Sequence, residues 1–207
     1  MRLFTDWHTR EAAETGLREH LPAQTVQRLT EAIRFAEAMH GDQRRPTGVP
    51  YIEHLLEALE VIVVGARVTD PDVLTAVIVH DVVEDTDCTL AQLAERFGPK
   101  VADLVDWVTI REPGPGEDPA EVKREALARL AAAPRDAVLV KLADRASNVQ
   151  TLRNLRPDRQ RSYYAQTVAY IVPLADREPW FAAWYRDWQA AHRDLAPGAP
   201  ATPDSPP

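Results

Sequence analysis

The chain has 207 residues, of which 45% are apolar, so it is long enough to fold around a sizeable core and too apolar to be a disordered protein. Its net charge of −8 and the lack of any block of Lys and Arg argue against a surface built for nucleic acid. The single cysteine, Cys88, excludes an intramolecular disulfide and a zinc site made of thiolates. Because no apolar run approaches the length of a membrane span, we expect a cytoplasmic protein with no membrane partner.

Nearly every segment of the chain carries the apolar spacing of three and four residues that is typical of a helix. The expected helices cover about 22–40, 50–64, 71 to the acidic cluster at 80–85, 89–97, 101–108, 121–133, 137–155, 158–174 and 179–195. We find no convincing strand and no internal repeat. The sequence therefore predicts an all-α protein, with residues 1–195 as one domain and the proline-rich residues 196–207 as a disordered tail.

Several helix boundaries are marked by local signals. Gly41 is a plausible end for the helix before it, and Asp70-Pro71 combines an N-cap with proline at the first helical position. Thr89 and Gln92 have the spacing of a capping box. Residues 111–119 contain three prolines and two glycines, so they form a loop, which is either a plain connector or a lid over a site.

The stretch from His80 to Asp85, His-Asp-Val-Val-Glu-Asp, ends an apolar run and concentrates acidic groups. On a helical wheel with His80 at zero, Glu84 falls at about 40°, Asp81 at about 100° and Asp85 at about 140°. Carboxylates beside residues that favour burial need cations or hydrogen bonds, and a metal ion is a compact solution. The alternative is an acidic helix end in water, and this stretch alone does not decide between the two.

A second informative stretch is the predicted helix after Pro134. Most of its circumference is apolar, but Lys141, Asp144, Asn148 and Thr151 recur at spacings of three and four and form one polar stripe. The ordinary explanation is a stripe that faces solvent. Because the stripe is narrow and Asp144 is flanked by Lys141 and Arg145, we favour the wall of a pocket.

These features together resemble a known family. His54, then His80-Asp81, then Asp144 is the order of the HD phosphohydrolase superfamily, although His54 alone would more often be a core residue. The resemblance is closer to the hydrolase domain of RelA/SpoT-type alarmone enzymes, over roughly residues 25–170. The segments that carry it are Gly41-Asp42-Gln43-Arg44-Arg45, Pro50-Tyr51-Ile52-Glu53-His54, His80-Asp81-Val82-Val83-Glu84-Asp85-Thr86, Phe97-Gly98 and Lys141-Leu142-Ala143-Asp144-Arg145.

The resemblance implies roles for individual residues. One divalent metal would be bound by His54, His80, Asp81 and Asp144. In this family the metal is usually manganese, and Fe²⁺ or Zn²⁺ are alternatives for such a mixed N/O set. The implied catalytic carboxylates, which act on the attacking water and on the leaving oxygen, are Glu84 and Asp85. The implied contacts to the nucleotide are Arg44, Arg45, Lys141, Arg145, Asn148 and Thr151.

The reaction that the resemblance implies is removal of the 3′-pyrophosphate from guanosine tetra- or pentaphosphate, giving GDP or GTP. The segment after residue 175 is too short for a synthetase domain, so we expect a hydrolase-only enzyme. Two departures concern the substrate: Ser147 stands where the family usually has histidine, and Pro46-Thr47 leaves the register of Arg44 and Arg45 open. The alternatives are an HD hydrolase for another nucleotide, such as an adenosine analogue or a phosphorylated dinucleotide, and a non-catalytic nucleotide-binding module. The oligomeric state stays open.

Overall fold

The computed structural model describes residues 1–198, and this part of the chain contains helices and connections but no β-strand. Helix α4 (Pro71–Val79) lies at its centre. It packs against α2 (Ala23–His40), α3 (Ile52–Glu60), α7 (Pro99–Val108) and α9 (Arg135–Gln150). The predicted all-α fold is confirmed.

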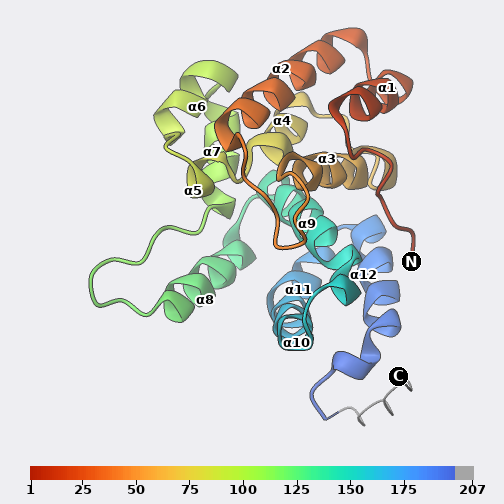
Figure 1. Ribbon diagram of the computed structural model, residues 1–207, viewed down its shortest axis with the longest axis vertical. Helices are drawn as coiled ribbons and strands as arrows, with labels where there is room; N and C mark the ends of the chain where they lie inside the picture. The colour runs from red at the N-terminus through yellow and green to blue at the C-terminus, as the bar shows by residue number, and fades with distance from the viewer. Residues whose placement is uncertain (199–207) are drawn as a thin grey trace.

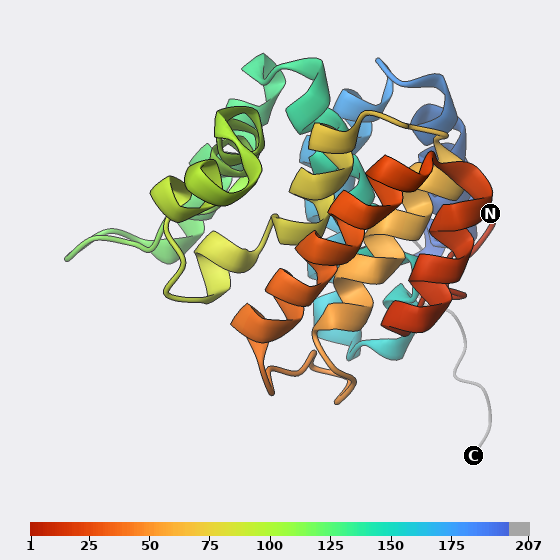
Figure 2. The same cartoon turned by 90° about the horizontal axis from the view of Figure 1, so that it is seen from above.

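The remaining helices surround this centre (Figures 1 and 2). They are α1 (Arg10–His20), α5 (Val82–Asp85), α6 (Leu90–Phe97), α8 (Pro119–Arg129), α10 (Pro157–Gln166), α11 (Val172–Ala175) and α12 (Pro179–Ala191), with π-helical turns at Val61–Gly65 and Thr167–Ile171. Figure 2 shows α1, α2 and α3 side by side, and Figure 1 shows the connection between α7 and α8 extending away from the other helices. No helix in residues 1–198 is long and apolar enough to cross a membrane.

The predicted capping signals form as expected. The Asp70 side chain accepts hydrogen bonds from the backbone N–H groups of Asp72 and Val73, and Pro71 opens α4. Thr89 and Gln92 make both hydrogen bonds of a capping box at the start of α6. All seven residues from Val73 to Val79 are buried. Each fully buried Val, Leu or Ile contributes about 1.5–3 kcal/mol, so α4 is held firmly in the core.

The sequence prediction was wrong at one boundary that matters for the site. We expected one helix through Asp85, but α4 ends at Val79 and α5 begins at Val82. Asp81, between them, has φ −95° and ψ −5°. On an uninterrupted helix two consecutive side chains diverge by about 100°. The break allows His80 and Asp81 to point to the same place. Helix α1 was not predicted.

Candidate metal centre and adjoining pocket

Four side chains from separate parts of the chain meet beside the core. His54 comes from α3, His80 and Asp81 from the junction between α4 and α5, and Asp144 from α9. The Nε2 atoms of His54 and His80 lie 3.3 Å apart. Oδ2 of Asp81 lies 3.5 Å from Nε2 of His54 and 3.1 Å from Nε2 of His80. Oδ1 of Asp144 lies 3.4 Å and 3.5 Å from the same two nitrogens.

The separations of the two imidazole nitrogens from each other and from each carboxylate oxygen suit ligands that share one metal ion. Nitrogen and oxygen ligands stand about 2.0–2.2 Å from a transition metal, so neighbouring ligands in octahedral or tetrahedral geometry lie roughly 3.0–3.5 Å apart. The ligand atoms of His54, His80 and Asp81 all lie within 4.8 Å of one another. Asp144 joins this group through its contacts to both imidazoles.

The orientation of His80 also fits a metal. Its Nδ1 lies 2.8 Å from the carbonyl oxygen of Val77, which only accepts hydrogen bonds, so Nδ1 carries a proton. In the neutral ring, Nε2 then carries a lone pair, which faces the carboxylates of Asp81 and Asp144. Lone pairs this close repel one another unless a proton or a metal lies between them. Neutral imidazole and ionised carboxylate are the forms that bind a divalent metal.

The charges at this centre favour one additional cation. Burial lowers the pKa of His80, but the negative charges of Asp81 and Asp144 outweigh it and hold that pKa well above its ordinary value. Burial raises the pKa of Asp144, yet the Lys141 ammonium, 2.8 Å away, and the two imidazoles hold it well below its ordinary value. Both carboxylates therefore stay ionised, and the centre takes up either a proton on His80 or a metal.

A supporting layer of hydrogen bonds connects the centre to the loop after α2. The hydroxyl of Tyr51 donates to Oδ2 of Asp81 at 2.5 Å, and burial raises the pKa of Tyr51 far above its ordinary value, so it stays a donor. The Tyr51 ring stacks on His40, with centroids 4.5 Å apart. Nδ1 of His40 lies 2.8 Å from Oε1 of Gln43, whose Nε2 donates to Asp85 at 3.1 Å. His40 therefore holds Tyr51 and Gln43, the two side chains that contact Asp81 and Asp85.

The two predicted catalytic carboxylates border the centre on its exposed side. Glu84 and Asp85 lie on the short helix α5, immediately after Asp81, and both are exposed. An oxygen of Glu84 accepts a hydrogen bond from the backbone N–H of Ile110 at 2.9 Å. Desolvation by neighbouring protein atoms and the negative charge of Asp81 raise the pKa of Glu84. This carboxyl therefore holds a proton more readily than an ordinary glutamate does.

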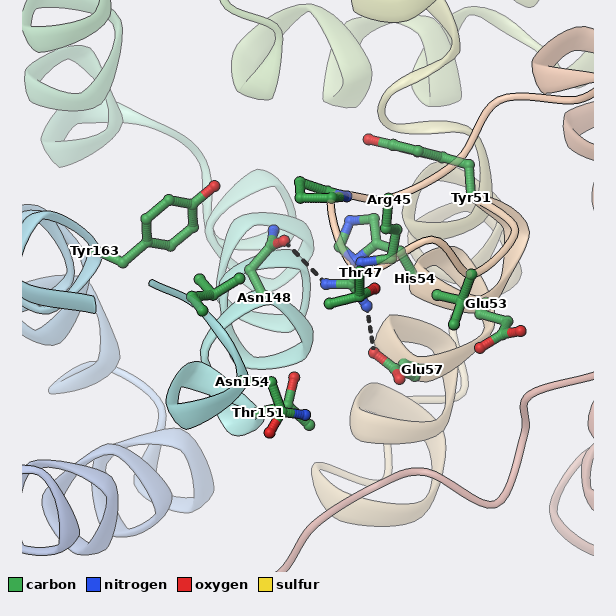
Figure 3. A pocket seen from close by; sticks show the side chains of 13 residues that line it. Arg45, Thr47, Tyr51, Glu53, His54, Glu57, Asn148, Thr151, Asn154 and Tyr163 are labelled. Atoms are coloured by element: carbon green, nitrogen blue, oxygen red, sulfur yellow. Dashed lines mark hydrogen bonds and ion pairs between the residues drawn. The ribbon is translucent and has the colours of Figure 1, made fainter. Parts of the chain in front are cut away.

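A pocket of about 310 Å³ opens beside the centre, and His54 and Tyr51 form part of its wall. The structure separates the two adjacent arginines. Arg45 lines the pocket and lies between Glu57 and Asn148, at 3.1 Å and 3.4 Å (Figure 3). Arg44 donates instead to the carbonyl oxygen of Gly48 at 2.8 Å and is not part of this wall.

The polar stripe of α9 does not face solvent. The exposed fractions of Lys141 and Asp144 are only 6% and 5%. The side-chain amide of Asn148 donates to Oδ1 of Asp144 at 2.6 Å, and Asn148 and Thr151 both line the pocket. The stripe thus begins with two buried residues, Lys141 and Asp144, and ends with two half-buried residues that line the pocket, so the pocket interpretation fits its second half.

Cations gather next to the stripe. Arg145 is buried, its guanidinium lies over the Tyr163 ring with 5.4 Å to the centroid, and its Nε has no hydrogen-bond partner among residues 1–198. Lys123 on α8 has its pKa lowered by burial and by the positive charges of Arg145 and Lys141. Because these positive charges repel one another, the group favours the binding of an anion. Arg145 is not one of the residues that line the pocket.

The sequence analysis missed several residues of this region. Lys123 and Tyr163 belong to helices without a recognised motif, so no local signal marked them. Glu57 lies three residues after His54, a spacing that places both on one helix face and gives a usable signal. Ser147 attracted attention only as a departure from the motif, but its hydroxyl contacts His54.

Comparisons with known proteins agree with this geometry. The sequence pattern described as "HD domain" matches residues 32–181. A guanosine-3′,5′-bis(diphosphate) 3′-pyrophosphohydrolase of Aquifex aeolicus is 38% identical over 163 residues, which is 78% of this chain and 23% of that protein. The bifunctional (p)ppGpp synthase/hydrolase SpoT of Escherichia coli is 34% identical over 170 residues, 81% of this chain and 24% of that protein. The chain thus spans about a quarter of the length of these curated relatives.

A solved structure is also similar over most of its length. Its title reads "A metazoan ortholog of SpoT hydrolyzes ppGpp and plays a role in starvation responses". The two structures superpose with a TM-score of 0.72 at 29% sequence identity, over 82% of this chain and 97% of the other.

Proposed function

Because this chain belongs to the HD-domain family, which implies a divalent metal, we propose that it removes the 3′-pyrophosphate from guanosine 3′,5′-bis(diphosphate). The products are GDP and pyrophosphate, and the pentaphosphate would give GTP. The strongest support is the convergence of two imidazoles and two ionised carboxylates beside a pocket lined by Arg45. The choice of nucleotide is supported by similar proteins that are named for this reaction.

The residues we assign to the metal are His54, His80, Asp81 and Asp144. Mixed nitrogen and oxygen ligands suit Mn²⁺, which is our first choice, and Fe²⁺ and Zn²⁺ are the alternatives. A divalent cation held there would supply a Lewis acid that stabilises charge on a phosphoryl oxygen and acidifies a water molecule. Tyr51 and Lys141 keep Asp81 and Asp144 oriented through hydrogen bonds at 2.5 Å and 2.8 Å.

We assign the proton transfers to the carboxylates on α5. Glu84 would take a proton from the attacking water, and its raised pKa makes it a stronger base than an ordinary glutamate. The new bond joins the water oxygen to the phosphorus next to the 3′ oxygen, and the bond from that phosphorus to the 3′ oxygen breaks. The leaving 3′ oxygen gains the proton that Glu84 took from the water, and Glu84 returns to its ionised form. Asp85, held by Gln43, would orient the water.

The pocket residues are assigned to the nucleotide. Arg45, Asn148 and Thr151 line the pocket and offer donors to phosphate, ribose or base. Lys141 and Arg145, with Lys123 beside them, would balance the phosphate charge. Arg44, which bonds to Gly48 outside the pocket wall, would reach only the outer edge of the nucleotide.

We further propose that residues 1–195 act as one domain, because α12 contacts α9 at the centre of the fold. Tyr185 on α12 donates to the carbonyl of Leu142 at 2.9 Å, next to the metal centre. The predicted tail, 196–207, lies mostly outside the described residues. A cytoplasmic location stays a prediction, and a nucleotide substrate agrees with it.

The test is product analysis with the purified full chain. It would be incubated with guanosine tetraphosphate, with an adenosine analogue and with a phosphorylated dinucleotide, each with Mn²⁺ or with chelator. We expect GDP and pyrophosphate from guanosine tetraphosphate, only with metal, and turnover lowered about 10²–10⁴-fold by Glu84→Gln. Turnover of a different nucleotide would replace the substrate assignment. Nucleotide binding without turnover under any metal would instead favour the binding-module alternative.

A further inference from the structure

A line of buried polar contacts leads from the metal centre to the pocket. Nδ1 of His54 lies 2.9 Å from the hydroxyl of Ser147. That hydroxyl lies 2.7 Å from Oε2 of Glu57, and the same carboxylate oxygen accepts from Arg45 at 3.1 Å. Ser147 is completely buried, and the exposed fractions of His54 and Glu57 are only 2% and 9%. Ser147, in the middle of this line, is therefore closed to water.

Two acceptors lie within reach of the single hydroxyl proton of Ser147: Oε2 of Glu57 at 2.7 Å and the backbone carbonyl of His54 at 3.3 Å. The carboxylate is the closer and the charged acceptor, so the proton points to Glu57. The oxygen of Ser147 then accepts, which requires the proton of a neutral His54 to be on Nδ1. Nε2 of His54 is left as a lone pair, and it is this nitrogen that faces His80, Asp81 and Asp144. The contacts thus select the tautomer that can bind a metal.

We propose that Ser147 and Glu57 are positioning residues that hold His54 in its metal-binding tautomer and orientation. The inference rests on the proposed metal-dependent function. Ser147 acts on the ring through its oxygen, and Glu57 orients the Ser147 hydroxyl through a charge-assisted hydrogen bond. Hydrogen bonds of this kind behind a histidine ligand raise its basicity and fix its ring.

The same line connects the metal centre to the pocket. Arg45 contacts Glu57 on one side and Asn148 on the other, and both contacts lie in the pocket wall (Figure 3). Asn148 in turn donates to Asp144 at 2.6 Å. Arg45 therefore reaches two metal-centre residues, His54 through Glu57 and Ser147, and Asp144 through Asn148. A ligand that contacts Arg45 therefore changes the hydrogen-bonding environment of both His54 and Asp144.

The test compares three variants of the full chain stripped of metal. Ser147→Ala removes the acceptor for His54, and we expect its Mn²⁺ dissociation constant, measured by calorimetry, to rise about ten- to hundredfold. Ser147→Thr keeps the hydroxyl and should stay closer to the wild type. The matched control is Thr75→Val, which removes another buried hydroxyl and should leave Mn²⁺ affinity unchanged. Within residues 1–198 that hydroxyl bonds only to the Pro71 carbonyl.

A second readout separates positioning from simple packing. In protein with ¹⁵N-labelled histidine, we expect the His54 ring of the wild type to be protonated at Nδ1 and that of Ser147→Ala to shift toward protonation at Nε2. If Ser147→Ala does not fold, Glu57→Gln takes its place. Glutamine keeps an oxygen acceptor without the charge, so its loss of Mn²⁺ affinity should be smaller but measurable.

Two results would overturn the inference: Mn²⁺ affinity of the substituted protein within twofold of the wild type, or an unchanged His54 tautomer. This failure is distinct from failure of the proposed function. Wild-type turnover of guanosine tetraphosphate together with unaltered metal binding by Ser147→Ala would reject only the positioning role. Weakened metal binding by Ser147→Ala, with no turnover by the wild type, would reject only the proposed reaction.

Discussion

His80 and Asp81 follow a nine-residue helix buried in the core, whereas Glu84 and Asp85, a few residues later, lie on a four-residue helix at the surface. The exposed fraction of His80 is 1%, while Glu84 and Asp85 are exposed and held by contacts to Ile110 and Gln43. The positions of the proposed metal ligands are thus set by helix packing. The carboxylates assigned to proton transfer depend on single hydrogen bonds from connecting segments.

This contrast separates metal binding from turnover. Substitutions in the buried centre should change both metal affinity and folding stability. Substitutions on α5 or in the pocket should change rate or substrate affinity while metal affinity stays constant.

Replacing Asp144 should have the largest effect. Asp144→Ala removes a proposed ligand, so metal binding and turnover should be lost together, as measured by calorimetry and by pyrophosphate release. It also leaves Lys141 buried without its partner, which costs about 3–5 kcal/mol of unfolding free energy. The double variant Asp144→Ala, Lys141→Met removes the unpaired charge. It should recover much of that stability in chemical denaturation but none of the metal binding.

Replacing Glu84 should affect turnover alone. Glu84→Gln keeps the shape of the side chain but cannot take a proton, so kcat should fall about 10²–10⁴-fold. The Mn²⁺ dissociation constant should equal that of the wild type, because Glu84 is not assigned to the metal. A variant that retained the full rate would show that the proton acceptor lies elsewhere.

The two adjacent arginines provide a matched pair for the pocket. Arg45→Ala removes a charged donor from the pocket wall and should raise the KM for guanosine tetraphosphate about ten- to hundredfold. Arg44→Ala, which removes a side chain bonded to Gly48, should change KM only slightly. Steady-state kinetics would contradict this assignment if the two substitutions had equal effects or if Arg44→Ala had the larger one.

A substitution at the far end of α4 should have the smallest effect. Asp70→Ala removes the N-cap and should lower the unfolding free energy by about 1 kcal/mol, while Asp70→Asn keeps a capping oxygen. Burial raises the pKa of Asp70, but hydrogen bonds from Val73 and Lys100 outweigh it and lower that pKa. The stabilisation is therefore present above the ordinary aspartate pKa and is lost as pH falls through the lower value in the folded state. Urea titrations across that pH range measure this stabilisation. The kcat of both Asp70 variants should equal that of the wild type.

Much of this could be predicted from the sequence because it depends on local patterns. Apolar spacing located most of the helices, and the caps at Asp70 and Thr89 are local hydrogen bonds that depend on the residues themselves. The spacing from Lys141 to Thr151 predicted a polar stripe that forms a pocket wall, and Asn148 and Thr151 do line the pocket. The resemblance to a family supplied the grouping of His54 with His80, Asp81 and Asp144, which lie far apart in sequence.

What the sequence did not predict depends on contacts between distant segments. The break between α4 and α5 occurs at Asp81, which is held by Tyr51 from another segment, and no residue at the break is a helix breaker. Ser147 and Glu57 are 90 positions apart and become partners only because α3 packs against α9. The difference between Arg44 and Arg45 likewise depends on which of them faces Glu57.

The most direct test of this account is a metal titration of the stripped protein, with bound metal and pyrophosphate release from guanosine tetraphosphate measured in parallel. We predict that the rate rises in proportion to metal bound, reaches its maximum at one ion per chain and returns to background when chelator is added, with GDP as the co-product. Full turnover by the metal-free protein, or metal occupancy that rises without any pyrophosphate release, would contradict it.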